Sequence, residues 1–187
     1  MTAPSCVGIQ GGPGSFNEAA WRSFGRPESR VRYYPDTPAV LAALRAGDID
    51  HAQFAVLSAG EEVAETAAAL VRHVAAGASL RVVRTYEMET PYALLGAPGD
   101  DTPVRLVAGH PTALKDSRAD LAALAPQARL EGHVDPLPVA ERLARGELPP
   151  GTAVLGCAEL ARLLPLAVVV PSVTPVPPRT RFALASL

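Results

Sequence analysis

The chain has a single lysine, Lys115, among 17 basic residues, and these are set against 19 acidic residues for a net charge of −2. The basic residues are scattered along the sequence, which argues against a phosphate-backbone footprint and predicts no nucleic-acid partner. No apolar run reaches the roughly 18–20 residues of a membrane span. The N-terminus also lacks the basic and apolar regions of a signal peptide. We therefore expect a cytoplasmic protein with no membrane partner.

Cysteine is scarce too. Cys6 and Cys157 are the only two cysteines, they lie far apart, and they match no metal-ligand spacing. His51, His73 and His133 are scattered and form no H-x-x-x-H motif. The serines lack a G-x-S-x-G elbow, which leaves a hydrolase triad without support. We predict no metal site and two free thiols.

Hydrophobic residues make up 48% of the 187-residue chain, which is enough to form a buried hydrophobic core. Short apolar runs alternate with helical patterns, which is typical of α/β architecture. Strands are expected at 7–9, 31–34, 54–57, 80–86, 92–95, 104–107, 129–133, 154–155 and 168–170. Helices are expected after residue 15, between 36 and 46, and at 61–74, 111–124, 138–145 and 157–164.

The segment Pro171–Pro178 holds four prolines in eight residues and can be neither helix nor central strand. It predicts a stiff crossover between two α/β lobes, with the chain returning to the first lobe at its end. The predicted first lobe is 1–79 plus 175–187, and the predicted second lobe is 80–174.

The stretch Arg179-Thr180-Arg181-Phe182 leads directly into an apolar strand. Arginine can hold a carboxylate through two parallel hydrogen bonds, and a threonine hydroxyl can donate another. The stretch therefore predicts an anion-handling corner at a strand start. The alternative is an edge strand whose arginines only solvate its end.

A glycine loop, Gly11-Gly12-Pro13-Gly14-Ser15-Phe16, follows the first expected strand. It is neither a G-x-G-x-x-G fingerprint nor a P-loop, so carboxylate binding by backbone N–H groups fits better than nucleotide phosphate. The alternative is a tight turn feeding a helix that Ser15 caps, with Glu18 as its capping-box partner.

Two other places could carry chemistry. His110 precedes a helix start and is a candidate general acid or base or, equally, a turn cap. Thr112 lies at the same helix entrance and is a candidate ligand contact or cap. Glu61 and Glu62 follow a buried strand; they either enter a cleft or form a solvated first helical turn.

Taken in order, these stretches resemble the catalytic domain of prephenate dehydratase. Residues 12–16, G-P-G-S-F, resemble the family's G-P-x-G-[ST]-F loop with one residue deleted. Residues 109–114, G-H-P-T-A-L, are similar to its S-H-P-Q-A-L, and residues 178–182, P-R-T-R-F, are similar to its closing N-x-T-R-F.

The resemblance implies a two-lobed, periplasmic-binding-protein-like (type II) α/β fold with an inter-lobe cleft, and a homodimer. It implies a reaction that removes CO2 and the ring hydroxyl from prephenate, a small carboxylate substrate, without a cofactor. Thr180 would donate to the leaving hydroxyl, and Arg181 would help hold a carboxylate. The implied substrate-binding residues are Gly12, Gly14, Ser15, His110, Thr112, Phe182 and Glu61. Family members commonly append a regulatory ACT domain, and we expect none here.

The sequence also departs from the family pattern. Pro178 stands where the family has asparagine, Gly109 stands for its serine, and Glu61-Glu62 falls where it has an amide and a hydroxyl. We therefore predict a divergent lyase acting on a small cyclic carboxylic acid, in specialised metabolism. Two alternatives stay open: a non-aromatising prephenate decarboxylase or dehydratase-like enzyme of a tropone-type pathway, and a non-catalytic binder of a small carboxylate.

Overall fold

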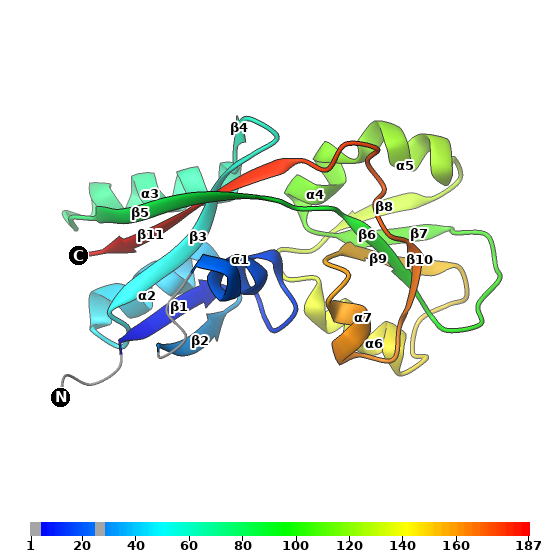
Figure 1. Ribbon diagram of the computed structural model, residues 1–187, viewed down its shortest axis with the longest axis horizontal. Helices are drawn as coiled ribbons and strands as arrows, with labels where there is room; N and C mark the ends of the chain where they lie inside the picture. The colour runs from blue at the N-terminus through cyan, green and yellow to red at the C-terminus, as the bar shows by residue number, and fades with distance from the viewer. Residues whose placement is uncertain (1–4, 25–28) are drawn as a thin grey trace. The chain divides into compact units, whose positions relative to one another are not determined.

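The computed structural model describes residues 5–24 and 29–187, which divide into two compact units, each with its own sheet (Figure 1). Unit 1 comprises Met1–Pro13, Asn17–Met88 and Arg179–Leu187, and unit 2 comprises Gly14–Phe16 and Glu89–Pro178. Strands and helices alternate along most of the chain, which confirms the predicted α/β class.

Unit 1 is built on a sheet with the order β2-β1-β3-β11-β5, to which β4 adds beside β3. Strands β1, β2 and β3 are parallel, and β11 is antiparallel to β3. Its elements are β1 (Cys6–Gln10), α1 (Phe16–Phe24), β2 (Arg30–Tyr34), α2 (Thr37–Ala46), β3 (His51–Ser58), β4 (Glu61–Glu62), α3 (Ala64–Ala75), β5 (Arg81–Glu89) and β11 (Arg179–Ser186).

The two faces of this sheet are covered by different helices. One face packs against α2 and α3 through a core that includes Leu41, Phe54 and Ala69. The other face packs against α1, where Trp21 meets Val7 of β1. These buried apolar contacts hold both faces of the sheet away from water.

Helix α2 shows why local sequence sets its bounds. The Asp36 carboxylate accepts a hydrogen bond from the Ala39 backbone N–H at 2.8 Å, which satisfies one orphan donor at the helix start. At the other end Gly47 adopts φ 75°, the left-handed conformation that glycine takes without steric cost. The sequence predicted a helix between residues 36 and 46, and α2 lies within these bounds.

Unit 2 has a sheet with the order β10-β6-β9-β7-β8. Strands β7, β8 and β9 are parallel, β6 is antiparallel to β9, and β10 is antiparallel to β6. Its elements are β6 (Ala93–Gly96), β7 (Leu106–Gly109), α4 (Pro111–Asp116), α5 (Arg118–Leu124), β8 (Arg129–Gly132), α6 (Leu137–Ala144), β9 (Thr152–Gly156), α7 (Leu160–Leu163) and β10 (Ala167–Val170). Leu155 and Val154, adjacent in β9, enter separate cores on the two faces.

Two predicted boundaries differ from the structure. Strand β5 belongs to the sheet of unit 1, although residues 80–174 were predicted as the second lobe. Glu61 was predicted to begin a helix, but it lies in β4 and pairs with β3 in a hairpin. Ala59 and Gly60, both with positive φ, make the two-residue turn of that hairpin, and α3 begins only after it.

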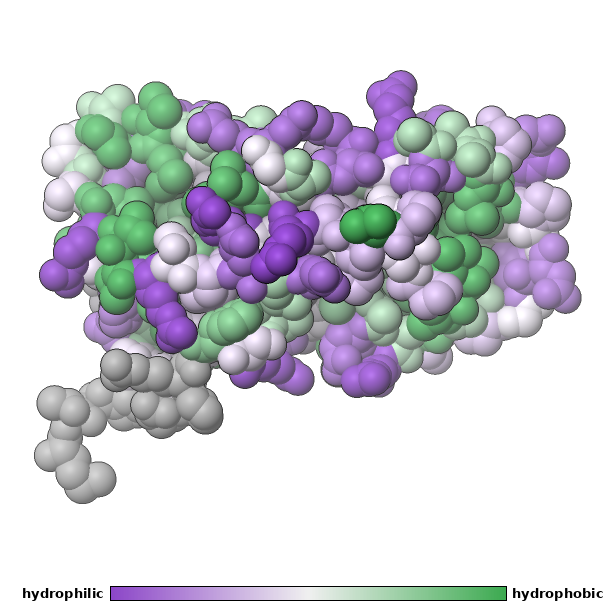
Figure 2. All heavy atoms as spheres, turned by 45° about the horizontal axis from the view of Figure 1, so that its top comes forward, coloured by the Kyte–Doolittle hydropathy of each residue, from purple (hydrophilic) through white to green (hydrophobic). Residues whose placement is uncertain are grey.

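Unit 1 also exposes apolar side chains. Val71 and Val74 of α3 are 69% and 60% exposed, and Val82 and Val83 of β5 are 57% and 47% exposed. Hydrophobic surface gathers over this part of the unit in Figure 2. In the described part of the chain, no helix combines the length and the apolar character needed to cross a membrane.

Candidate functional site

The carboxyl ends of the parallel strands in unit 1 meet at one edge of the sheet, the usual place for ligands in open α/β sheets. The glycine loop begins after β1, and Ser58 ends β3. Because β11 runs antiparallel to β3, its start lies at this same edge, with Thr180 directly opposite Ser58. Two sequence-predicted features, the loop and the T-R-F strand, therefore come to one edge.

Three polar residues stand in a row here, and we refer to Thr180, Ser58 and Glu61 as the polar row. Ser58 pairs in register with Thr180 on one side and with Glu61 on the other. Directly opposite residues of antiparallel strands point to the same face, with Cβ atoms about 4.5–5.5 Å apart. Thr180 and Ser58 are buried, at 5% and 3% exposure, while Glu61 is exposed. The row thus joins two buried hydroxyls to a solvent-facing carboxylate.

The polar row lies on the face of the sheet that α1 covers. Phe182, two residues after Thr180 on the same side of β11, stacks on Tyr86 with ring centroids 6.0 Å apart. Tyr86 in turn stacks on Phe24 of α1 at 4.9 Å. Phe182 is therefore a buried packing residue, 1% exposed, that fixes the strand carrying Thr180.

Arg181 points to the opposite face of β11, because successive side chains alternate along a strand. Its Nε donates to Glu87 Oε1 at 2.7 Å, and Arg179 makes a longer ion pair with Glu87 Oε2 at 3.8 Å. The structure therefore does not bring Arg181 and Thr180 to one face. The Arg181 guanidinium already has an internal carboxylate partner.

The glycine loop needs its glycines. Gly11 and Gly14 have φ values of 84° and 78°, a region that favours glycine. A Cβ at Gly14 would also lie 2.9 Å from Leu160 Cδ2. Gly12 and Gly14 are buried and Ser15 is half-buried. The loop ends at the first residue of α1, where backbone N–H groups suit an anion.

A buried hydrogen-bond chain beneath α1 was not predicted. Gln53, fully buried in β3, donates through Nε2 to the Asn17 backbone carbonyl at 2.5 Å and accepts from the Tyr86 hydroxyl. Burial raises the pKa of Tyr86 far above its usual range, so the phenol keeps its proton and donates. The chain ties the first turn of α1 to β3. Its only sequence signal was a glutamine inside an apolar run.

The corresponding corner of unit 2 follows β7. His110 precedes α4, and its Nδ1 accepts from the Thr112 backbone N–H at 3.3 Å, as a helix cap does. Of the two interpretations left open by the sequence, this geometry favours the cap. Thr112 contributes its backbone N–H to that bond and is half-buried.

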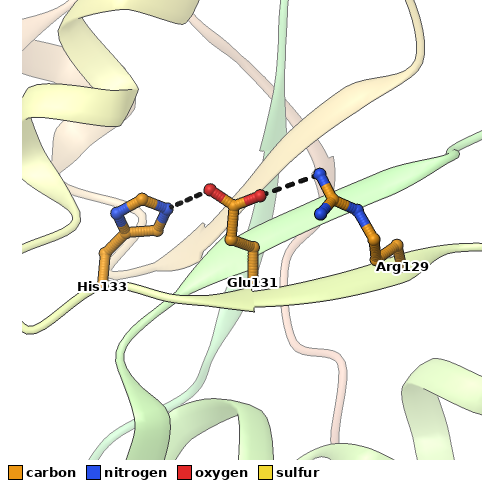
Figure 3. A network of polar contacts seen from close by, with 3 residues as sticks. All are labelled: Arg129, Glu131 and His133. Carbon is orange, nitrogen blue, oxygen red and sulfur yellow. Dashed lines mark hydrogen bonds and ion pairs between the residues drawn. The ribbon is translucent and has the colours of Figure 1, made fainter.

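His133 follows β8 and lies beside this corner. Its backbone N–H donates to the Gly109 carbonyl at 2.9 Å. Figure 3 shows Glu131 between His133 and Arg129, with both contacts at 2.9 Å. The carboxylate orients the imidazole at the sheet edge. Among the residues that the structure describes, no group of three or more His, Cys, Asp or Glu side chains is placed to hold a metal ion, and both cysteines are free thiols.

Comparison with known proteins places the chain in a family. The prephenate dehydratase family model matches residues 7–186. A prephenate dehydratase from Arthrobacter aurescens, solved in complex with L-Phe, has 22% sequence identity and a TM-score of 0.79, covering 97% of this chain and 60% of that chain. None of the curated proteins matches the sequence significantly.

Two further structures share the fold. GqqA, a novel type of quorum quenching acylase, has 23% identity and a TM-score of 0.71, covering 97% of this chain and 63% of that one. The periplasmic domain of Bordetella pertussis BvgS has 18% identity and a TM-score of 0.50, covering 98% of this chain and 37% of that one. These likenesses show the two-sheet, periplasmic-binding-protein-like (type II) α/β fold that was predicted.

This chain spans about 60% of the length of the Arthrobacter dehydratase. The family model nevertheless covers nearly all of its residues, from β1 to the last residue of β11, and includes both the glycine loop and the T-R-F strand. On that coverage, the chain belongs to the prephenate dehydratase family.

Proposed function

We propose that this protein is a dehydratase-type lyase that expels a ring hydroxyl from a small cyclic carboxylic acid of the prephenate type, in specialised metabolism. The observation that carries the proposal is the polar row. In this row Ser58 lies between Thr180 and Glu61, at the edge of the sheet where its parallel strands end, and such edges commonly bind ligands. Family membership supports the same reaction class.

The chemistry asks little of the protein. In prephenate dehydration the bond between the ring and its carboxylate breaks, and its electron pair enters the ring as CO2 leaves. The electrons displaced through the ring break the C–O bond to the hydroxyl, whose bonding pair leaves with the oxygen. One proton turns the departing hydroxide into water. Aromatisation drives the reaction, so the protein needs only to orient the carboxylates and stabilise the leaving oxygen.

In the proposed mechanism Thr180 donates its hydroxyl proton toward the leaving oxygen, and Ser58 fixes the direction of that hydroxyl. Backbone N–H groups of the glycine loop hold a substrate carboxylate. Glu61, exposed at the end of the row, relays a proton from solvent to the hydroxyls. Arg181, bound to Glu87, orients the start of β11.

A second candidate is a non-catalytic binder of a small carboxylate. Two observations weigh against turnover of a dianion: the Arg181–Glu87 pair leaves a guanidinium engaged inside the chain, and the charge of Glu61 repels a dianion. The two candidates differ in turnover. A binder gives ligand-dependent thermal stabilisation and no product.

The test is a prephenate assay on the purified protein, with product identified by mass and ultraviolet spectrum. Thr180→Val keeps the side-chain shape and removes the hydroxyl, so turnover should fall at least about 100-fold. Thr180→Ser should restore most of it. Thr174→Val is the matched control: Thr174 is also buried, its hydroxyl has no hydrogen-bond partner in the described structure, and turnover should change less than about twofold.

The outcomes separate the candidates. Phenylpyruvate formation that depends on Thr180 supports the dehydratase. A non-aromatic product of decarboxylation alone, unaffected by Thr180→Val, overturns the role of the hydroxyl. Thermal stabilisation by prephenate with no consumption supports the binder, and neither consumption nor stabilisation removes prephenate as the ligand.

A further inference from the structure

Strand β5 is the outermost strand of the unit 1 sheet. The strand order ends at β5, and within the described residues no strand pairs with its outer side. It is nine residues long and contains neither proline nor glycine. An unpaired edge of this length presents a row of backbone N–H and C=O groups ready for another strand.

The other edge strands of the two sheets are shorter than β5. Strand β8 has four residues and bears the ion pair of Arg129 and Glu131, and His133, directly after the strand, bonds to the same carboxylate (Figure 3). Strand β2 has five residues and exposes Arg30 and Arg32. Short length and charge protect edges from self-association. Strand β10 exposes Val168 and Val169, but it has only four residues and Pro171 follows it. Strand β5 exposes Val82 and Val83 side by side within a strand of nine residues.

The charges of β5 are complementary to a reversed copy of themselves. Its first half carries Arg81 and Arg84, and its second half carries Glu87 and Glu89. In an antiparallel pair centred on Thr85, Arg81 of each strand lies opposite Glu89 of the other strand, which gives two such pairs. Val82 then lies opposite Met88, and no like charges meet. A parallel pair in register would set arginine on arginine and glutamate on glutamate, which is unfavourable.

Apolar surface beside the strand extends the contact. On β11, Arg181 lies on the same face as Ala183, which belongs to the core under α2 and α3. Arg181 binds Glu87 of β5, and Val83, four residues before Glu87, points to the same side of β5. Val83 therefore lies on the face that α3 covers. Val71 and Val74 of α3 are exposed there, and Figure 2 shows the hydrophobic surface at this part of the unit. Pairing two copies would cover this surface as well as the edge.

We propose that β5 is a self-association surface, and that its occupant is β5 of a second copy of this chain, paired antiparallel about a two-fold axis at Thr85. The two sheets of unit 1 then form one continuous sheet. A closed, isologous contact of this kind also removes both exposed edges at once. The proposal is independent of the reaction that the protein catalyses.

Analytical ultracentrifugation over a range of concentrations tests the pairing. The wild-type protein should approach twice the chain mass of 19.4 kDa. Arg81→Glu and Glu89→Arg each place like charges opposite one another twice and should each weaken dimerisation about tenfold or more. The double variant Arg81→Glu/Glu89→Arg restores opposite charges and should recover the wild-type dissociation constant.

Arg129→Glu is the matched control, because it reverses an exposed arginine on the other sheet's edge strand and should leave dimerisation unchanged. A monomer at all concentrations overturns the proposal. So does a dimer that the single charge reversals do not weaken, or one that the double reversal fails to restore. Circular dichroism confirms that each variant is folded.

A cross-link gives the register directly. Opposite residues of an antiparallel pair have Cα atoms about 4.5–5.5 Å apart, within the range that a disulfide spans. Thr85→Cys should therefore form a covalent, reducible dimer on mild oxidation, whereas wild type, with only Cys6 and Cys157, should not. Failure of Thr85→Cys to cross-link under conditions where the protein is dimeric overturns the Thr85-centred register.

Discussion

In unit 1 the strands run in the order β2-β1-β3-β11-β5, and in unit 2 the matching order is β8-β7-β9-β6-β10. In each, three parallel strands are followed by two more, of which the first is antiparallel to its neighbour among the three. Their contents differ. Unit 1 buries Gln53, Ser58 and Thr180 in its central strands, whereas unit 2 ends its parallel strands in Gly109, Gly132 and Gly156.

The difference separates two tasks that one scaffold can perform. Buried hydroxyls and amides cost free energy unless they are hydrogen-bonded. A sheet therefore retains them mainly where they have a hydrogen-bond partner or a functional role. Glycines at strand ends let backbone groups approach a ligand instead. At its strand ends and in its central strands unit 1 therefore carries buried polar side chains, where unit 2 has glycines. The following predictions probe that contrast, beginning with the largest effect.

Gln53→Leu should break the polar interior of unit 1. It leaves the Tyr86 hydroxyl and the Asn17 carbonyl without their buried partner. Each loss costs about 1–3 kcal/mol, so the free energy of unfolding should fall by about 2–6 kcal/mol. Urea unfolding followed by the fluorescence of Trp21, the only tryptophan and a member of this unit, measures it.

Gln127→Leu is the control, because this glutamine is exposed and bonds only to an exposed arginine. Its unfolding free energy should change by less than about 0.5 kcal/mol. A change below about 1 kcal/mol for Gln53→Leu would show that the hydrogen-bond chain contributes little.

Gly109→Ser tests whether unit 2 can accept the side chain that the family carries there. A Cβ at this position would lie 3.0 Å from Leu155 Cβ and 3.2 Å from its backbone oxygen. Backbone cannot retreat easily, so the free energy of unfolding should fall by about 1–2 kcal/mol. Thermal unfolding by circular dichroism measures this.

Gly132 ends the neighbouring strand, β8, and Gly132→Ser serves as the comparison. Its Cβ would meet only Pro111 Cγ, at 3.5 Å, which is ordinary contact. Stability should stay within about 0.5 kcal/mol of wild type. If the two substitutions lower the free energy of unfolding equally, crowding by Leu155 is not the reason that position 109 lacks a side chain.

The smallest effect concerns alkaline pH. Burial, together with a hydrogen bond to Glu18, raises the pKa of Tyr33 to about 12 from 10.0. The folded state thus keeps a proton that the unfolded chain loses, so stability is complete below pH 10 and declines as pH rises toward 12. The slope cannot exceed about 1.4 kcal/mol per pH unit, and solvent screening of this 39%-exposed residue lowers it.

Comparison of wild type with Tyr33→Phe isolates this contribution, because Tyr86 is present in both proteins. The difference between their unfolding free energies should narrow from pH 10 to pH 12. Parallel curves over that interval would mean that Tyr33 titrates alike in the folded and unfolded states.

Local features of the fold followed from the sequence, and long-range ones did not. Asp36 and Gly47 bound α2 through contacts within a few residues, so pattern alone predicted that helix. The hairpin at Glu61 depends on Ala59 adopting a positive φ, which no residue type signalled. The place of β5 depends on β11, about a hundred residues later, and its pattern contains no trace of that partner.

The candidate site divides in the same way. Thr180 and the glycine loop were predicted because their motifs are contiguous, and the structure brings both to one sheet edge. Gln53 was missed because its meaning comes from Tyr86, 33 residues away. Arg181 was predicted to help hold a substrate carboxylate near Thr180, and strand alternation turns it to the other face, where Glu87 binds it.

The position of β11 between β3 and β5 affects the order in which the chain can fold during synthesis. Every strand of unit 2 precedes Pro171 and leaves the ribosome earlier than residues 179–186. Unit 2 can complete its sheet while unit 1 still has a missing central strand, and the edges of β3 and β5 stay open until the last strand is released. A chaperone that binds nascent chains would therefore meet unit 1 with these edges open, although the first residues of unit 1 are synthesised before any of unit 2.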